Sequence, residues 1–301
     1  MRLPANQHCS ARKGSWPAAA LVVSLSCLWF GGSLWAAELP LKDQPHLRRP
    51  IAAAWLVENE LLAVANQRSG SLSIVESEKR KVLREVSVGE RLADVAALPS
   101  AGWLLAVDEK RHELLVLQWE AGELRIAERI PVSRYPVSIA VSPDGSRCTV
   151  ASLWSRTITT FGIKPAEGPA PPTLTRLNEL VLSFAPSGQI YLPNGEHVLV
   201  ADAFTGQLAV LDVTAQSVIE IRADHLFRIY GMSLSADPGG LLIAHQALFR
   251  LPPPKQGKGA NQNNKNQDNN AKRLSNFFGE YSIAGLLEGR LAKKRPEDLP
   301  G

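Results

Sequence analysis

The sequence predicts an all-β fold built from repeated four-stranded units, and three observations support this prediction. Of the 301 residues, 45% are hydrophobic and 21% are charged, so the chain has enough apolar residues to bury a large core. Short runs of apolar and β-branched residues alternate with Gly, Pro, Asn and Asp through most of the chain. Before residue 284, no helical periodicity persists for more than about two turns.

The first 37 residues have the three parts of a secretory signal. Arg12 and Lys13 form a basic region, an uncharged apolar stretch follows, and Ala36 and Ala37 precede the first acid. We therefore predict a signal helix over residues 1–37 and an extracytoplasmic location in the periplasm, at the cell surface or outside the cell. The alternative is an uncleaved anchor, because the apolar stretch is just long enough to span a bilayer. Beyond this segment we predict no membrane contact.

Five units then follow, each with an apolar strand, a turn, a second apolar strand and a short polar residue. The first two strands are predicted at 50–55 and 61–66, 92–98 and 103–108, 137–141 and 148–152, 189–192 and 197–202, and 232–235 and 241–245. The polar residues that end the second strands recur roughly every 40–50 residues. They are Asn66, Asp108, Ser152, Asp202 and His245.

Alternating apolar and polar residues predict two more strands in each of the first four units. These are 72–75 and 82–88, 114–118 and 124–130, 158–161 and 174–180, and 208–211 and 218–221. Four strands at this spacing are typical of the blades of a β-propeller. We therefore predict a β-propeller over residues 38–255, with about five four-stranded blades visible.

One stretch carries a family resemblance, with support from two shorter matches. The stretch is Pro136-Val137-Ser138-Ile139-Ala140-Val141-Ser142-Pro143-Asp144-Gly145, and the shorter matches are Ala65-Asn66 and Val210-Leu211-Asp212. Over about residues 47–250 the chain resembles the YVTN-type β-propeller repeats of exported bacterial proteins. The first unit departs from that pattern because it lacks Pro-Asp-Gly, and the fifth departs from it after His245. In larger exported proteins, the resemblance implies a propeller that often partners a cytochrome c or quinoprotein domain.

The repeat pattern stops near residue 255. Residues 256–272 are rich in Asn, Gln, Lys and Gly, which predicts a disordered loop. Residues 273–301 are predicted to be an irregular segment, a possible remnant of further blades, with a strand at 280–283 and a short helix at 286–294. Propellers of this spacing usually have seven or eight blades. Three explanations stay open. The chain is part of a longer protein, such as one with a seven-bladed propeller, or a truncated gene product, which we favour; it is a complete but irregular small propeller; or it closes by pairing with another copy.

Charge and cysteine content exclude several classes of protein. The net charge is +4, but three basic residues and no acid lie in the leader, so the rest is nearly balanced. This argues against a nucleic-acid partner, which needs concentrated positive charge. Cys148 is the one cysteine beyond the leader, which excludes an internal disulfide framework, a four-cysteine zinc site and a CxxCH haem attachment within this chain. We predict that Cys148 is a buried core residue, and we predict no metal and no cofactor.

Aligning the units on their polar strand ends places Arg49, Arg91, Tyr135 and Arg228 at one position before the first strand. The fourth unit has Ala185 there. Strand direction brings this position to the same face as the ends of the second strands. We therefore predict a basic collar that binds an anionic small molecule or an acidic surface of a partner protein. The alternative is that these side chains only cover the rim and pair with Asp108 and Asp202.

Asp108, Asp202 and His245 occupy equivalent positions in this candidate site and invite a metal-site interpretation. A simpler interpretation is that short polar residues cap the turns after the strands, as Asn66 and Ser152 would also do. The sequence contains no catalytic motif, so we favour a binding or protein-interaction scaffold that acts through one propeller face. The alternatives are a redox-associated propeller that partners a cytochrome c domain or protein, and a propeller enzyme like the sugar-lactone hydrolases.

Overall fold

The computed structural model describes residues 47–291, apart from 59, 101, 166–169, 222–227, 237–238 and 251–271. These residues belong to one unit, His46–Gly301, and form a β-propeller of five antiparallel sheets with one short helix. The predicted signal helix lies outside the described residues. The predicted loop over 256–272 also lies outside them, except for Lys272, which begins the last strand.

Four blades have four strands each, and the fifth has three. Blade 1 comprises β1 (Pro50–Val57), β2 (Leu61–Asn66), β3 (Ser71–Glu76) and β4 (Lys81–Ser87). Blade 2 comprises β5 (Leu92–Ala97), β6 (Trp103–Asp108), β7 (Glu113–Glu120) and β8 (Glu123–Pro131). Blade 3 comprises β9 (Pro136–Val141), β10 (Arg147–Ser152), β11 (Thr157–Lys164) and β12 (Thr173–Val181). Blade 4 comprises β13 (Pro186–Tyr191), β14 (His197–Asp202), β15 (Leu208–Asp212) and β16 (Ser217–Ile221). Blade 5 comprises β17 (Arg228–Leu234), β18 (Gly240–Arg250) and β19 (Lys272–Ser282).

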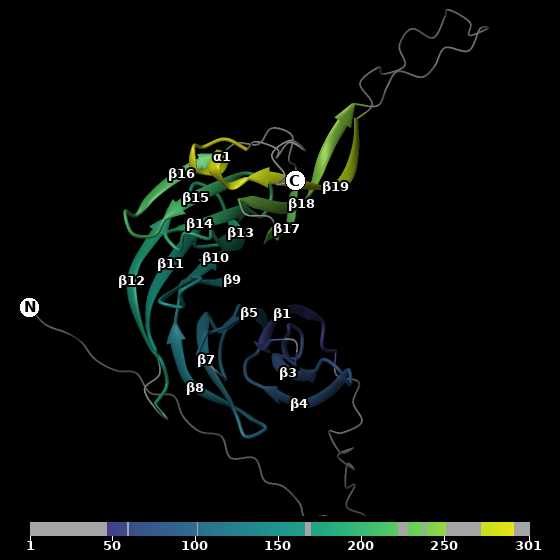
Figure 1. Ribbon diagram of the computed structural model, residues 1–301, viewed down its shortest axis with the longest axis vertical. Coiled ribbons are helices and arrows are strands. Elements are labelled where there is room, and N and C mark those ends of the chain that lie inside the picture. The colour runs from purple at the N-terminus through teal and green to yellow at the C-terminus, as the bar shows by residue number, and fades with distance from the viewer. Residues whose placement is uncertain are drawn as a thin grey trace, which may run out of the picture. The chain divides into compact units, whose positions relative to one another are not determined.

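The blades follow one another in chain order, as the colours of Figure 1 show. The first strand of each blade packs against the first strand of the next, from β1 through β5, β9 and β13 to β17. Each of these first strands also carries one extra residue near its start, where the pairing with the second strand shifts register. The extra residues are Ile51, Ala93, Val137, Ser187 and Tyr230. The repeat seen in the sequence therefore extends to backbone geometry.

Apolar clusters lie between neighbouring blades. In β6, Leu104 belongs to the cluster shared with blade 1, and Leu105 belongs to the cluster shared with blade 3. Successive side chains of a strand point to opposite faces of its sheet, so a strand in the middle of a stacked blade is largely apolar on both faces. All six residues of β6 are accordingly buried. This is why most of the second strands, such as β6 and β14, appear in the sequence as apolar runs that end in a polar residue.

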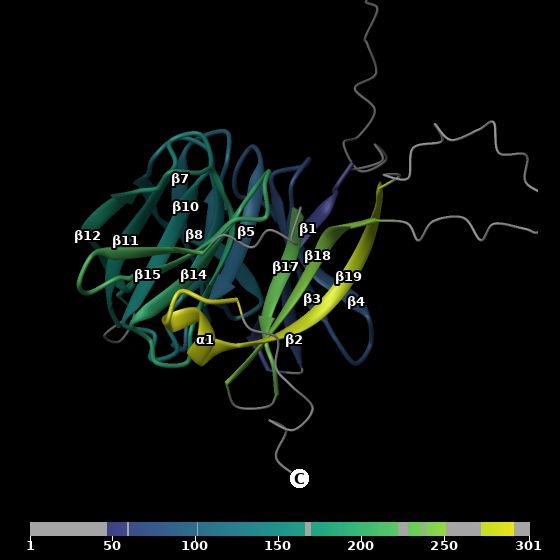
Figure 2. The same ribbon diagram turned by 90° about the horizontal axis from the view of Figure 1, so that it is seen from above.

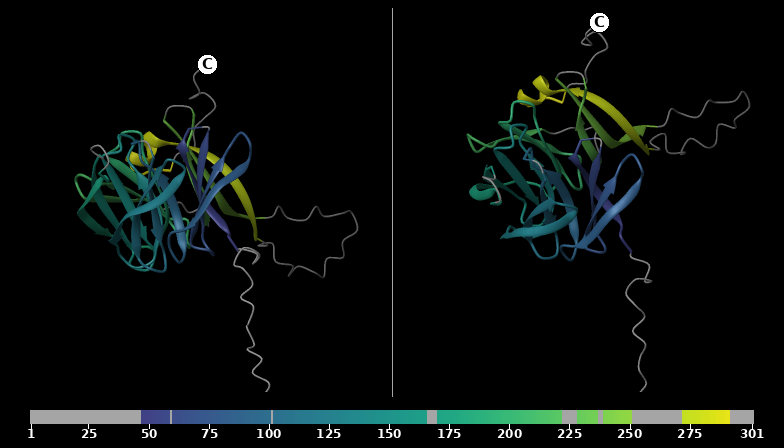
Figure 3. Two further views of the ribbon diagram at one scale, coloured as in Figure 1. Left: turned by 90° about the horizontal axis from the view of Figure 1, so that it is seen from below. Right: turned by 60° about the horizontal axis from the view of Figure 1, so that its bottom comes forward.

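Blade 5 differs from the sequence-based expectation at its third strand. Residues from Lys272 to Ser282 form β19, which pairs with β18 along its whole length, from Arg250↔Lys272 to Gly240↔Ser282. Figure 2 shows β17, β18 and β19 side by side, and Figure 3 shows β19 leading into the short helix α1. This helix spans Ile283–Leu287, earlier than the predicted 286–294, and the Ser282 side chain caps it by accepting the Gly285 N–H. Part of the segment predicted to be irregular therefore belongs to blade 5.

Among the described residues, none of the helical structure is long and apolar enough to cross a bilayer.

Candidate functional site

The predicted collar positions are equivalent in the backbone of four blades. In each, the residue after the second strand donates its N–H to the carbonyl of the residue before the first strand. These bonds run from Gln67 to Arg49 (2.9 Å), Glu109 to Arg91 (2.9 Å), Leu153 to Tyr135 (2.9 Å) and Ala203 to Ala185 (2.8 Å). In blade 5, Arg228 pairs with Gln246, the residue after His245. We call the end of the blades that carries these residues the collar face.

Backbone conformation sets two of the collar residues apart. Arg49 has φ 53° and Tyr135 has φ 58°, both in the left-handed region that residues other than glycine seldom adopt. Such conformations persist where the surrounding bonds hold them, and they are frequent at ligand-binding positions. The carbonyl hydrogen bonds do not by themselves require this conformation, because the Arg91 and Ala185 carbonyls accept the same bonds and neither residue has a positive φ.

Several basic side chains of the collar face have partners. Arg91 Nε lies 3.2 Å from Glu109 Oε2, and Lys110 and Arg111 both pair with Glu90. The Arg228 guanidinium lies over the ring of Tyr230, 5.5 Å from the ring centroid. The carboxylate that pairs with the Arg91 guanidinium is therefore Glu109, whereas Asp108 accepts the backbone N–H of Arg91 at 3.3 Å.

Four other arginines of this face are exposed and carry no such pairing. Among the described residues, no carboxylate lies within ion-pairing distance of Arg49, Arg68, Arg134 or Arg156. Arg134 directly precedes Tyr135, and Arg156 lies in the turn between β10 and β11. The collar face therefore carries positive charge that the described part of the chain does not neutralise.

Asp108 and Asp202 are buried, and each caps the turn that follows its strand. Asp108 Oδ1 accepts backbone N–H groups from Lys110 (2.9 Å) and Arg111 (3.0 Å). It also reaches the preceding loop, because Asp108 Oδ2 accepts the N–H of Glu90 at 2.6 Å. Asp202 accepts both the N–H and the hydroxyl of Thr205. These contacts are those of structural caps.

His245 is buried inside blade 5. Its Nε2 lies 3.1 Å from the Tyr281 hydroxyl, and its Nδ1 lies 3.1 Å from the carbonyl oxygen of Gln246. The ring therefore joins the second strand of the blade to the third. Within the described ranges, no group of three or more His, Cys, Asp or Glu side chains is arranged to hold a metal ion.

The structure adds a row of aromatic side chains to the collar face that the sequence analysis did not single out. The ring centroids of Tyr135 and Trp154 are 6.4 Å apart, and those of Trp154 and Phe204 are 6.2 Å apart. All three rings are exposed. Trp154 and Phe204 each lie two residues beyond the polar residue that ends a second strand, so the repeat register held a signal for this row.

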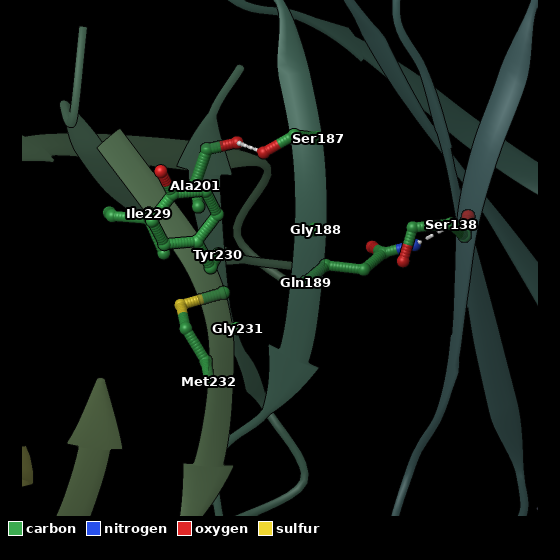
Figure 4. Close-up of a pocket in the computed structure, with 9 residues that line it drawn as sticks. All are labelled: Ser138, Ser187, Gly188, Gln189, Ala201, Ile229, Tyr230, Gly231 and Met232. Carbon is green, nitrogen blue, oxygen red and sulfur yellow. Dashed lines mark hydrogen bonds between the residues drawn. The ribbon is translucent and has the colours of Figure 1, made fainter. Parts of the chain in front are cut away.

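A pocket of about 240 Å³ lies between the first strands of blades 4 and 5 (Figure 4). Gly188 on β13 and Gly231 on β17 line it, and the space where each would carry a side chain is open to 4 Å. Ser187 donates to the carbonyl of Ala201 at 3.2 Å, and Gln189 reaches across to the carbonyl of Ser138 on β9 at 3.0 Å. The pocket is thus an open space over two glycine-bearing bulges, with hydroxyl and amide groups in its wall.

Asp94 lies beside this wall and joins blade 2 to blade 3. Its Oδ2 accepts the Ser138 hydroxyl at 3.0 Å and the Ile139 N–H at 2.9 Å, and its Oδ1 accepts the Val95 N–H at 2.8 Å. Burial raises the pKa of Asp94 above its usual value, although these hydrogen bonds favour the charged form. An acid within the apolar run 92–98 was the sequence signal for this contact.

Cys148 lies where the sequence predicts. It is a fully buried member of the cluster between blades 2 and 3, together with Leu105 and Phe161. Burial raises the pKa of its thiol to about 12, so the reactive thiolate is not formed near neutral pH.

No family model and no curated protein matches the chain. The fold resembles those of many solved chains, among them hydrazine synthase of Kuenenia stuttgartiensis, with a TM-score of 0.60 and 16% sequence identity. The alignment covers 79% of this chain and 64% of the other, so this chain spans less than two thirds of that protein's length. At this identity, the likeness concerns the propeller fold alone.

Proposed function

We propose that this chain is an exported β-propeller of the YVTN type that binds an acidic partner protein through its collar face. The observation that carries the proposal is the group of exposed arginines without carboxylate partners, which includes Arg49, Arg134 and Arg156. An arginine fork can hold a carboxylate with two parallel hydrogen bonds, and several such groups on one face attract an acidic surface over a distance.

The repeated backbone geometry also supports this proposal. The loops of successive blades meet at one face of a propeller, so residues at equivalent positions act together on one partner. A protein surface, or a segment of one, is large enough to contact arginines on blade 1 and blade 3 at once. The likeness to hydrazine synthase extends only to the fold, so it supports neither the redox alternative nor the hydrolase alternative.

A charge-matched pair of triple variants tests the proposal. We expect Arg49→Ala/Arg134→Ala/Arg156→Ala to weaken binding of a fluorescein-labelled peptide of glutamates and serines by about tenfold or more at low salt. Fluorescence anisotropy measures the affinity, and added salt should reduce it in the parent.

The control is Arg80→Ala/Arg125→Ala/Lys164→Ala, which removes the same charge at the opposite ends of the blades. These three residues are also exposed, and they lie near the turns that follow β3, β7 and β11. The control should bind the peptide as the parent does. Equal binding by the parent and the collar variant would overturn the proposal, and so would equal losses in the two variants.

A further inference from the structure

Beside the unpaired arginines, the collar face presents Tyr135, Trp154 and Phe204, which we call the aromatic strip. The three rings come from three separate loops: the start of β9, the turn between β10 and β11, and the turn between β14 and β15. The Trp154 and Phe204 rings are stacked with an interplanar angle of 30°, and Tyr135 meets Trp154 edge-on at 89°. The strip therefore runs across the boundary between blades 3 and 4.

The aromatic strip is exposed to an unusual degree for such large side chains. The exposed fraction is 40% for Tyr135, 61% for Trp154 and 57% for Phe204. Contiguous exposed aromatic side chains are uncommon on soluble proteins outside interaction sites. Trp, Tyr and Arg are also the residues that most often dominate the energy of a protein interface.

One end of the strip is held in place by a neighbouring blade. The backbone N–H of Tyr135 donates to His112 Nδ1 at 3.1 Å, and the two rings lie 5.2 Å apart. Tyr135 thus has a defined position before any partner binds, which lowers the conformational entropy that binding would cost.

Arg134 and Arg156 flank the aromatic strip on blade 3. Each lies within two residues of a strip member, and neither has a carboxylate partner among the described residues. A ligand that covers the strip would therefore place its own polar groups against guanidinium groups. This arrangement suits carboxylates interspersed with aromatic or large aliphatic side chains, and it disfavours a basic or purely apolar ligand.

We infer that the collar face recognises an extended acidic segment of a partner protein in which carboxylates are interspersed with aromatic side chains. The inference rests on the proposed function and adds the aromatic strip as the element that selects among acidic partners. Single-stranded nucleic acid also combines flat rings with negative charge. We favour a protein because acids already neutralise Arg91, Lys110 and Arg111 on this face, which leaves no continuous basic track along a strand.

Two labelled peptides test the inference: one in which phenylalanines alternate with glutamates, and a matched peptide with serine in place of phenylalanine. We expect the parent to bind the phenylalanine peptide about tenfold more tightly, in keeping with an aromatic contact at an interface. Trp154→Ala/Phe204→Ala should lose this preference while it binds the serine peptide as the parent does. Trp154→Phe should keep the preference, because the ring is retained.

The matched control is Trp55→Ala/Phe278→Ala, which removes the same two residue types, also exposed, from β1 and β19. It should keep the preference. If the parent binds both peptides alike, the inference is wrong, and the proposed function still stands as long as the arginine variant weakens binding of both. If the arginine variant binds both peptides like the parent, the proposed function itself fails.

A third probe addresses the nucleic-acid alternative. Labelled oligodeoxythymidine should bind the parent more weakly than the phenylalanine peptide and should not displace it. Tighter binding by the oligonucleotide, lost in Trp154→Ala/Phe204→Ala, would overturn the assignment to a protein segment. The circular dichroism spectrum and melting temperature of each variant show that it is folded, and Phe204→Ala alone serves if the double variant is not.

Discussion

Two aspartates on the neighbouring strands β5 and β6, the half-buried Asp94 and the buried Asp108, stabilise different parts of this propeller. Asp108 accepts N–H groups from the loops on both sides of it, at Glu90 and Lys110, and so fixes the geometry of the collar face. Asp94 instead joins two blades through Ser138 and Ile139. Both stabilise the loops and strands that present the candidate site.

Asp94 gives a pH-dependent prediction at this scale. Its pKa is raised in the folded state, so the native protein holds this proton more tightly than the unfolded chain does. The stability that Asp94 contributes is therefore greatest below the pKa of an unfolded aspartate, about 3.9, and it falls as pH rises through the raised folded pKa. The difference in unfolding free energy between the parent and Asp94→Asn should decline over this window in urea titrations at a series of pH values.

Asp144 provides the control of opposite sign. Hydrogen bonds from Ser142 and Ser146 lower its pKa to about 2, so its contribution is present above the unfolded pKa and lost as pH falls towards 2. The difference between the parent and Asp144→Asn should therefore grow with rising pH. A pH-independent difference for Asp94→Asn would show that Asp94 titrates alike in the folded and unfolded states.

At the scale of the elements, the turn between β2 and β3 forms hydrogen bonds with the connection between blades 1 and 2. Gly70, in the turn between β2 and β3, has φ +61° and accepts the N–H groups of Val88 and Gly89 at 3.0 and 2.9 Å. Those two residues begin the connection from blade 1 to blade 2. A Cβ atom on Gly70 would lie 2.2 Å from the carbonyl oxygen of Gly89, so no side chain fits without a shift of the backbone.

We therefore predict that Gly70→Ala lowers the free energy of unfolding by about 2 kcal/mol or more, within the range for overpacked sites. Gly122→Ala separates this effect from backbone strain, because Gly122 has φ +81° but a Cβ atom there would meet nothing within 4 Å. It should cost clearly less in the same denaturation experiment. Equal losses would show that backbone conformation, and not the contact with Gly89, sets the requirement for glycine at residue 70.

At the scale of the whole propeller, blades 2 to 4 pack between two neighbours in chain order. The first strand of blade 1 is more exposed than those of the middle blades: β1 has one buried residue, whereas β5 and β9 have three each. In stacked repeats, stability is roughly the sum of the units and their interfaces, so units that share fewer interfaces open more easily. The greater exposure of β1 thus predicts a gradient of local stability, which is lower in blade 1 than in the middle blades.

Hydrogen–deuterium exchange measures this gradient. We expect the backbone amides of β1 to exchange about tenfold faster or more than those of β9 under native conditions, because their local opening costs less free energy. The second strands β2 and β10, which pair with β1 and β9, allow the same comparison of exchange rates one strand further into each blade. Equal protection of β1 and β9 would contradict the prediction and would mean that β1 is covered in solution.

The sequence by itself determined the repeated architecture and the register of the collar positions. The bounds of β6 and β14, Trp103–Asp108 and His197–Asp202, match the predicted strands, because a strand buried on both faces must be a continuous apolar run between turn residues. The equivalence of Arg49, Arg91 and Tyr135 followed from the same periodicity, and the backbone hydrogen bonds at those positions agree with it.

Tertiary packing decided what these local signals do not encode. The strand β19 pairs with β18, although residues 251–271 separate the two strands in the sequence. No short turn motif between them therefore predicts the pairing. The Asp94–Ser138 contact joins residues 44 positions apart, and the aromatic strip joins loops of two blades. Periodicity reports which face of its own sheet a side chain occupies, but contacts between blades depend on how the sheets stack. The pocket, the ring contacts of the strip and the lack of carboxylate partners at the four arginines therefore emerged only from the folded structure.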